Sequence, residues 1–245
     1  MRYCAEISYL GSAFCGWQVQ PNGYTVQEAM GTALLKLFKR KTNVTGCSRT
    51  DSGVHARQYF CHFDADTDLP LARIAAALEY YTPKEIAVLR VTSKPDDFHA
   101  RYSSTGKNYV YRIVNGRVQN PFEIGRAWWV KYPLNESKMN MAAKAFIGTH
   151  DFSAFCAANT SVEDKVRTIK ECLVERRNTN LFEISVTADG FLYNMVRIIA
   201  GTLVAVGLEQ IEHDAVGNII ESKKRENAGI TAPACGLYLN KVYYE

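Results

Sequence analysis

Strand and helix patterns alternate in a fixed order along residues 2–92. Polar and apolar side chains alternate in the strand segments, as expected when one face of a strand is buried. The predicted strands cover residues 2–10, 42–45, 57–64 and 86–92, and the predicted helices cover residues 25–40 and 69–80. This order, βαββαβ, is the ferredoxin-like arrangement.

Both predicted helices of this part carry start signals. Thr25 and Glu28 are spaced as in a capping box, in which each side chain satisfies a free backbone N–H at the helix start. Pro70 suits a first helical turn, where its missing N–H costs nothing.

A polar connector at residues 94–106 is the predicted domain boundary. After it the plan repeats more loosely, with strands at residues 107–114, 123–131, 166–176, 181–188 and 235–244 and helices at 135–146, 191–207 and 214–222. Residues 148–164 are predicted to be a long irregular segment, which is often functional. We therefore predict an α+β fold of two ferredoxin-like halves, residues 1–101 and 102–245, which form a mostly antiparallel mixed sheet with helices packed on it.

Composition narrows the class of protein. The chain has 245 residues and a formal net charge of +4, which permits a nucleic-acid partner without arguing for one. No apolar run is long and charge-free enough for a membrane span, and the N-terminus does not resemble a signal peptide. The seven cysteines include no C-x-x-C pair, so we expect reduced buried thiols, no metal site and a cytoplasmic location.

Residues 46–56, with the sequence GCSRTDSGVHA, form a compact polar loop between two predicted strands. Arg49 and Asp51 bring a cation and a carboxylate close together, and Gly53 favours a turn. Two interpretations are open on these residues alone. The loop is either a tight surface turn with an incidental ion pair or a site held by the surrounding scaffold.

An arginine lies in a predicted helix that is otherwise suited to burial. Within residues 191–207, Arg197 shares one sector with Tyr193, Asn194 and Gly201, while apolar residues form a broad arc. A buried arginine requires a carboxylate or an anionic ligand. The candidate carboxylates are those of Asp51, Asp151, Glu183 and Asp189, and a purely structural salt bridge is equally compatible with the pattern.

The motifs of several enzyme classes are absent. Neither GxxxxGK[ST], GxGxxG nor G-x-S-x-G occurs. Asp51, Ser52 and His55 have the residue types of a hydrolase triad but are crowded into one turn, where they cannot easily line up. A carboxylate beside arginines stays ionised, which suits a nucleophile better than a general acid.

The loop at residues 46–56 closely resembles the G-R-T-D-A-G-V-H-A signature of the TruA family of tRNA pseudouridine synthases. Other motifs of that family follow in the same order along nearly the whole chain. They are Tyr9, Gly11, Phe14, GWQ at 16–18 and TVQ at 25–27; FHAR at 98–101 with Lys107, Tyr109 and Tyr111; and HDFS at 150–153, RTI at 167–169, FLYNMVR at 191–197, Ala232-Pro233 and Gly236-Leu237. The departures are Ser48, Ser52 and Ala234, which stand where glycine, alanine and proline are usual.

The resemblance implies an enzyme that isomerises uridine to pseudouridine at positions 38–40 of the tRNA anticodon stem-loop. It implies a homodimer that needs no cofactor and no metal, with an active-site cleft between the two halves of each chain. Asp51 matches the catalytic aspartate, Arg197 the arginine that pairs with it, and Tyr109 the tyrosine that contacts the target base. Arg49, which helps to hold the nucleotide out of the stack, is expected to bind substrate together with His55, Arg101 and Asn194.

Two alternatives remain at this stage. One is a tRNA-binding module that keeps the fold without the chemistry, although the presence of Asp51, Tyr109 and Arg197 together argues against it. The other is a hydrolase that uses Ser52 and His55.

Overall fold

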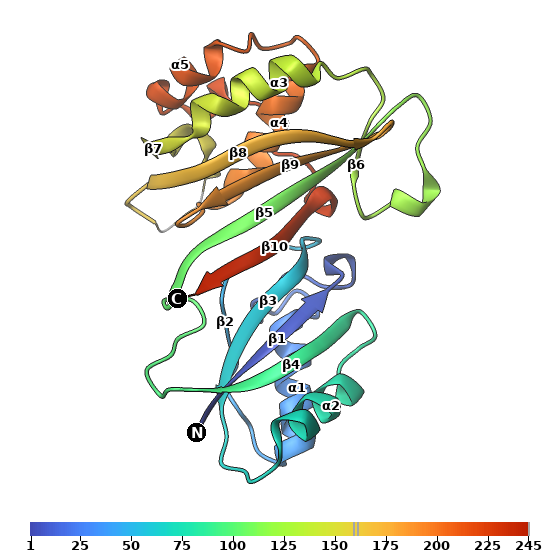
Figure 1. The fold of residues 1–245 in the computed structure, drawn as a ribbon, viewed down its shortest axis with the longest axis vertical. Coiled ribbons are helices and arrows are strands. Elements are labelled where there is room, and N and C mark those ends of the chain that lie inside the picture. Colours follow the sequence, from blue (N-terminus) through green and yellow to red (C-terminus); the bar gives the residue numbers. More distant parts are fainter. Residues whose placement is uncertain (159, 161, 245) are drawn as a thin grey trace. The chain divides into compact units, whose positions relative to one another are not determined.

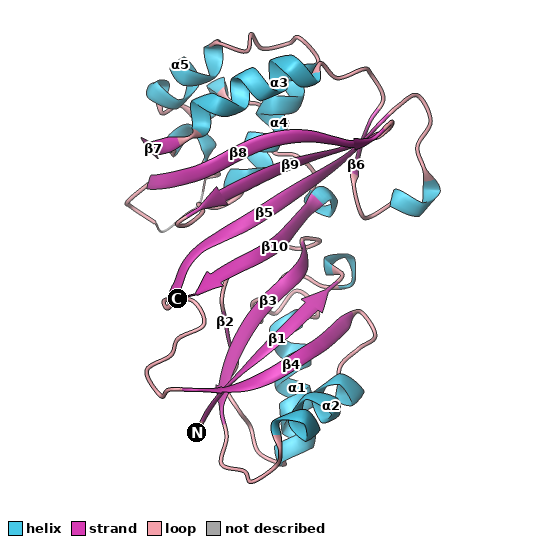
Figure 2. Cartoon of the chain, viewed as in Figure 1, coloured by secondary structure: helices cyan, strands magenta, loops and turns pink. Residues whose placement is uncertain are grey.

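The computed structural model describes residues 1–158, 160 and 162–244, and the chain divides into two compact units. The first unit holds residues 1–105 and the closing segment from Leu239, and the second holds residues 106–238. Helices and strands occur in both units (Figure 2), so the predicted α+β class is confirmed. The predicted halves, 1–101 and 102–245, place the closing strand in the second half, whereas it clusters with the first unit.

The first unit has the predicted βαββαβ order (Figure 1). Its elements are β1 (Arg2–Tyr9), α1 (Val26–Phe38), β2 (Thr45–Gly46), β3 (His55–Asp64), α2 (Leu71–Tyr81) and β4 (Ile86–Lys94). β1 pairs antiparallel with β3 and with β4, and β2 pairs with β3, which gives the order β4-β1-β3-β2 of a ferredoxin-like sheet. The closing strand β10 (Leu237–Tyr244) also lies beside β3.

The predicted capping signal of α1 is present in the structure. The Thr25 hydroxyl accepts a hydrogen bond from the Glu28 N–H at 3.3 Å, and the helix ends where Lys39 adopts a left-handed conformation with φ of 56°. α1 packs against α2, and α2 packs against β4. The cap therefore fixes where the chain turns from the segment after β1 into α1.

The segment between β1 and α1 differs from its expected exposure. Phe14 and Trp17 look exposed in the sequence because glycines and a proline surround them, but they are only 4% and 3% exposed. The Trp17 ring stacks on Tyr59 of β3 with centroids 4.3 Å apart. This segment is therefore part of the core of the first unit.

The second unit contains the helices α3, α4 and α5 together with a mostly antiparallel sheet. Its elements are β5 (Ser104–Asn115), β6 (Trp128–Val130), α3 (Glu136–Ala143), β7 (Gly148–Asp151), β8 (Val166–Asn178), β9 (Leu181–Ala188), α4 (Met195–Gly207) and α5 (Ala215–Ser222). The antiparallel order is β5-β9-β8-β7, and β6 runs parallel to β5. α3 packs on β8 and on α4. Single 3-10 turns of this unit lie at Pro121–Glu123, Lys144–Phe146, Ser153–Phe155, Arg225–Asn227 and Ala234–Gly236, and the first unit has one at Gly11–Ala13.

Four predicted boundaries were wrong. The strand expected at residues 42–45 is only Thr45–Gly46, and the strand expected at 123–131 is only Trp128–Val130, because Asn120 caps a 3-10 turn at Pro121–Glu123. The irregular segment expected at 148–164 begins with β7, which pairs with β8; its residues 159 and 161 lie outside the described residues. The helix expected from residue 191 starts at Met195, because Asn194 is left-handed with φ of 60°.

Candidate active site

The predicted catalytic loop lies between β2 and β3 in the first unit. Asp51 is half-buried and Arg49 is exposed. The Asp51 carbonyl accepts a hydrogen bond from Val54 N–H at 3.1 Å, and Gly53 has a φ of +81°, as the third residue of a type II turn requires. The turn holds Asp51 at a defined point of the backbone.

Backbone contacts fix this loop to the segment that follows β1. Trp17 N–H donates to the Thr50 carbonyl at 3.1 Å, and Gly53 N–H donates to the Phe14 carbonyl at 3.4 Å. A Cβ atom at Gly11 would lie 1.9 Å from the Val54 carbonyl oxygen. The segment and the loop approach each other so closely that only glycine fits at this position.

A buried side-chain hydrogen bond fixes the residue just before Asp51. The hydroxyl groups of Tyr9 and Thr50 lie 2.8 Å apart, and both residues are buried. Buried hydroxyls need partners, so loss of either one removes a buried hydrogen bond from the other. The prediction from sequence did not include Thr50 or Tyr9 among the site residues, although both belong to quoted motifs.

His55 was predicted to bind substrate. Its side chain is 1% exposed, and its Nδ1 accepts a hydrogen bond from Gly11 N–H at 3.0 Å. This contact joins the end of the catalytic loop to the segment after β1. A role of His55 toward substrate stays a prediction.

Arg197 lies in the first turn of α4 and is half-buried. Its Nε donates to the Ala232 carbonyl at 2.7 Å, and one terminal nitrogen donates to the Asn194 side-chain oxygen at 2.8 Å. The Arg197 carbonyl in turn accepts from Ala232 N–H at 3.1 Å. Two predicted site residues, Arg197 and Asn194, are thus in direct contact, and the guanidinium is held in one orientation.

Three of the four carboxylates considered as partners for Arg197 bind other groups. Asp151 accepts a hydrogen bond from the Ser153 hydroxyl and lies 2.9 Å from the Lys223 ammonium, and both contacts hold the pKa of Asp151 below its usual value. Glu183 lies 2.8 Å from Arg177, and Asp189 accepts from Thr168 N–H at 3.0 Å. The pairing of Arg197 with Asp51, which the family resemblance implies, stays a prediction.

Tyr109 on β5 is buried, and its ring meets Phe191 edge to face with centroids 4.9 Å apart. Tyr111 lies two positions after Tyr109, on the same face of the strand. Its hydroxyl donates a hydrogen bond to the Pro233 carbonyl at 2.7 Å. Burial raises the pKa of Tyr111, so the hydroxyl remains protonated. These contacts tie β5 to the segment at residues 232–233 that holds Arg197.

The predicted site residues thus form two groups. Arg49, Asp51, His55 and Arg101 belong to the first unit, and Tyr109, Asn194 and Arg197 belong to the second. The ion pair between Asp51 and Arg197 stays a prediction.

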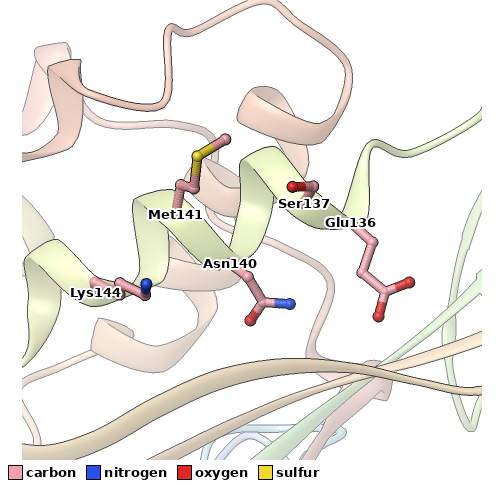
Figure 3. A pocket seen from close by; sticks show the side chains of 5 residues that line it. All are labelled: Glu136, Ser137, Asn140, Met141 and Lys144. Carbon is pink, nitrogen blue, oxygen red and sulfur yellow. The ribbon is translucent and has the colours of Figure 1, made fainter.

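A surface hollow of about 490 Å³ lies along α3 (Figure 3). Its lining residues are Glu136, Ser137, Asn140, Met141 and Lys144. The Asn140 amide donates to the Val174 carbonyl of β8 at 2.7 Å, so this side chain serves to join α3 to the sheet. The hollow contains none of the predicted site residues.

The described residues contain no group of three or more His, Cys, Asp or Glu side chains that could hold a metal ion. Among them, no helix has the length and apolar character needed to cross a bilayer.

Known proteins resemble this chain over nearly its whole length. A family model described as tRNA pseudouridine synthase matches residues 5–103 and 142–245. The tRNA pseudouridine synthase A of Staphylococcus aureus (strain MRSA252) is 42% identical over 245 residues, which is 100% of this chain and 92% of the relative. The tRNA pseudouridine synthase A of Thermoanaerobacter sp. (strain X514) is 44% identical over 238 residues, 97% of each chain.

One solved structure, described as a Cbf5-Nop10-Gar1 complex, aligns with 82% of this chain and 45% of its own chain. The identity is 14% and the TM-score is 0.37, so this likeness carries no argument about the fold.

Proposed function

Because this chain belongs to the tRNA pseudouridine synthase family, we propose that it isomerises uridine to pseudouridine at positions 38–40 of the tRNA anticodon stem-loop. One observation carries the proposal. The family match includes both the loop that holds Asp51 and the start of α4 that holds Arg197.

The reaction rearranges one nucleotide without adding atoms. The bond from N1 of uracil to C1′ of the ribose breaks, the base turns, and C5 of uracil bonds to C1′. The proton that leaves C5 is balanced by the proton gained at N1. Asp51 is the proposed nucleophile, because its half-buried side chain is a carboxylate and the proposed pairing with the Arg197 guanidinium favours the charged form that attacks. Attack at the base and attack at C1′ both fit this role.

The other predicted residues prepare the nucleotide for this attack. A base inside a stem must leave the stack before its glycosidic bond can be rotated. Arg49, which is exposed beside Asp51, is proposed to hold the nucleotide in this position. Tyr109 is proposed to contact the uracil, and Arg197 to pair with Asp51, with Asn194 orienting its guanidinium at 2.8 Å.

We further propose a cytoplasmic homodimer with one tRNA bound across both subunits and with no cofactor or metal. A dimer brings together two chains that each have a modest positive net charge, and this favours binding of a polyanion such as tRNA. Light scattering of the purified protein measures the subunit number, and a monomer at micromolar concentration would contradict the dimer. Activity should be unchanged in EDTA.

Pseudouridine mapping of bulk tRNA tests the function. A strain lacking this protein should lose pseudouridine at positions 38–40, and the wild-type gene should restore it. Purified wild-type protein should also form pseudouridine in unmodified tRNA. Binding of tRNA without any product would instead support the inactive tRNA-binding module.

A further inference from the structure

We propose that Tyr102, flanked by Arg101 and supported by His99, is a stacking site for an unpaired base of the tRNA. This inference rests on the proposed function, since it takes tRNA as the substrate. The site lies in the loop that joins β4 to β5 (Figure 1) and is separate from the Asp51 loop in sequence.

The Tyr102 side chain is 76% exposed, on a loop that is otherwise closely bonded to the first unit. Ala100 N–H donates to the buried Nδ1 of His62 at 3.1 Å, and the Tyr244 hydroxyl donates to the Ala100 carbonyl at 2.6 Å. Arg2 donates to the Phe98 carbonyl at 2.9 Å. The loop is therefore anchored from β1, β3 and β10, and Tyr102 is presented from a fixed backbone.

The loop also closes on itself through His99. Its Nδ1 accepts from the N–H groups of Arg101 and Tyr102 at 3.1 and 3.2 Å, and Ser103 N–H donates to the His99 carbonyl at 2.9 Å. The His99 and Tyr102 ring centroids lie 4.3 Å apart at 32°. Partial burial and the charges of Arg2 and Arg101 lower the pKa of His99, which keeps the supporting ring neutral.

Arg101 supplies the positive charge that a nucleotide needs. Its guanidinium lies 5.7 Å from the centre of the Tyr102 ring. In the described part of the chain it has no carboxylate partner. Asp64 on β3 is already bound by Arg2 at 2.9 Å. An aromatic face beside an unpaired arginine is the combination that holds a splayed base together with its phosphate.

A fixed aromatic side chain loses little conformational entropy when a base stacks on it. Unpaired bases stack on such rings with little dependence on base identity. The proposal thus concerns affinity and positioning of the RNA, and it does not give Tyr102 a part in the chemical step.

The first arm of the test compares tRNA binding by Tyr102→Ala and Tyr102→Phe. The alanine variant should raise the Kd for tRNA about 5- to 150-fold, whereas phenylalanine, which keeps the ring, should stay within about 2-fold of wild type. The matched control is Tyr80→Ala on α2. Tyr80 is 83% exposed and packs on Tyr81 at 5.2 Å, so its loss should leave the Kd unchanged.

The second arm measures the salt dependence of binding. Tyr102→Ala should keep the slope of log K against log salt, since stacking displaces no counterion. Arg101→Gln should reduce that slope by about 0.7 to 0.9, as expected for one lost phosphate contact. The rate of product formation at saturating tRNA should be unchanged in Tyr102→Ala.

The proposal is overturned if Tyr102→Ala binds tRNA like wild type, or if Tyr102→Phe is impaired as much as Tyr102→Ala. Thermal unfolding of each variant shows whether a weaker Kd comes from a damaged fold, and a lowered Tm in Tyr102→Ala alone would also count against it. If wild type makes pseudouridine but the Tyr102 variants bind normally, only this inference fails. If wild type makes none, the proposed function fails.

Discussion

Thr50 shows how single residues around Asp51 determine the geometry of the loop. Its side chain bonds to Tyr9 and its carbonyl accepts from Trp17, so side chain and backbone of one residue are both fixed. Asp51 follows directly in the chain. A small shift of a reacting group can cost a large factor in rate, and the buried hydroxyl pair is therefore a positioning contact for the proposed nucleophile.

Tyr9→Phe removes one hydroxyl and leaves that of Thr50 without this partner. We expect kcat for pseudouridine formation to fall about 10-fold with little change in KM for tRNA, because the loop moves while the RNA-binding surface remains. Stability should fall by about 1–3 kcal/mol. Tyr3→Phe on the same strand is the control, since the Tyr3 hydroxyl makes long contacts, 3.4 Å to the Thr67 carbonyl and 3.8 Å to the Met1 sulfur. Equal effects of the two variants on kcat would contradict the account.

His62 makes stability depend on pH. Burial, with smaller contributions from His99 and Arg2, lowers the pKa of His62 from 6.5 to about 4. The unfolded chain therefore binds the proton at a higher pH than the folded chain does. Above pH 6.5 neither state is protonated, and His62 does not lower the free energy of unfolding. As the pH falls from 6.5 towards 4, the free energy of unfolding decreases by up to about 3 kcal/mol.

His62→Asn isolates this contribution, because the Asn side-chain oxygen can replace Nδ1 as the acceptor for Ala100 N–H. Urea unfolding of both proteins between pH 4 and 7 gives the difference in unfolding free energy. Wild type should lose stability relative to His62→Asn as the pH is lowered. A difference that stays constant over this range would show that His62 does not titrate as described.

At the scale of the elements, Gly31 and Gly201 lie in similar helical sequences, but the space around them in the structure differs. A Cβ at Gly31 of α1 meets no atom within 4 Å, whereas a Cβ at Gly201 of α4 would lie 1.9 Å from the Ile230 carbonyl oxygen. Gly201 thus permits residues 229–232 to run against α4, and these residues include the Ala232 carbonyl that binds Arg197.

Alanine substitution at the two glycines should therefore change the free energy of unfolding in opposite directions. Gly31→Ala should stabilise the protein by about 0.5–1 kcal/mol through helix propensity. Gly201→Ala should destabilise it by about 2 kcal/mol or more, because a backbone segment must move. Denaturant unfolding measures both, and stabilisation by Gly201→Ala would contradict the close packing of residue 230 on α4.

Sequence patterns predicted most elements because their signals are local. The cap at Thr25, the alternation in β1 and the apolar arc of α4 depend on neighbouring residues only. The failures have non-local causes. β7 exists because β8 pairs with it, and Trp17 is buried against Tyr59, which lies far along the chain. The start of α4 was missed because Asn194 is left-handed, a conformation that no residue pattern announced.

For the whole molecule, the site residues were predicted from the family motifs and not from the organisation of the chain. Asp51, Tyr109 and Arg197 could be named because the motifs occur in order, and the family is confirmed. Their chemistry and their pairing remain predictions. The return of the chain from Leu239 to the first unit could not be foreseen, because β10 resembles any alternating strand until its neighbour β3 is known.

The roles of Thr50 and Tyr9 were missed for a related physical reason. Residue types reveal charged and nucleophilic groups, whereas positioning by a buried hydroxyl pair depends on β1 meeting the loop between β2 and β3. Gly11 belongs to a family motif, but the motif does not show why glycine is required. The reason is that the Val54 carbonyl leaves no room for a Cβ atom at this position.

The central claim is that Asp51 is the nucleophile of a tRNA-modifying site. The most direct measurement is pseudouridine formation in tRNA by Asp51→Asn, alongside Ser52→Ala as the neighbouring control and tRNA binding by both. Asp51→Asn should lose at least about 1,000-fold in turnover while its Kd for tRNA stays close to wild type, and Ser52→Ala should be nearly neutral. Product formation by Asp51→Asn at the wild-type rate would contradict the account.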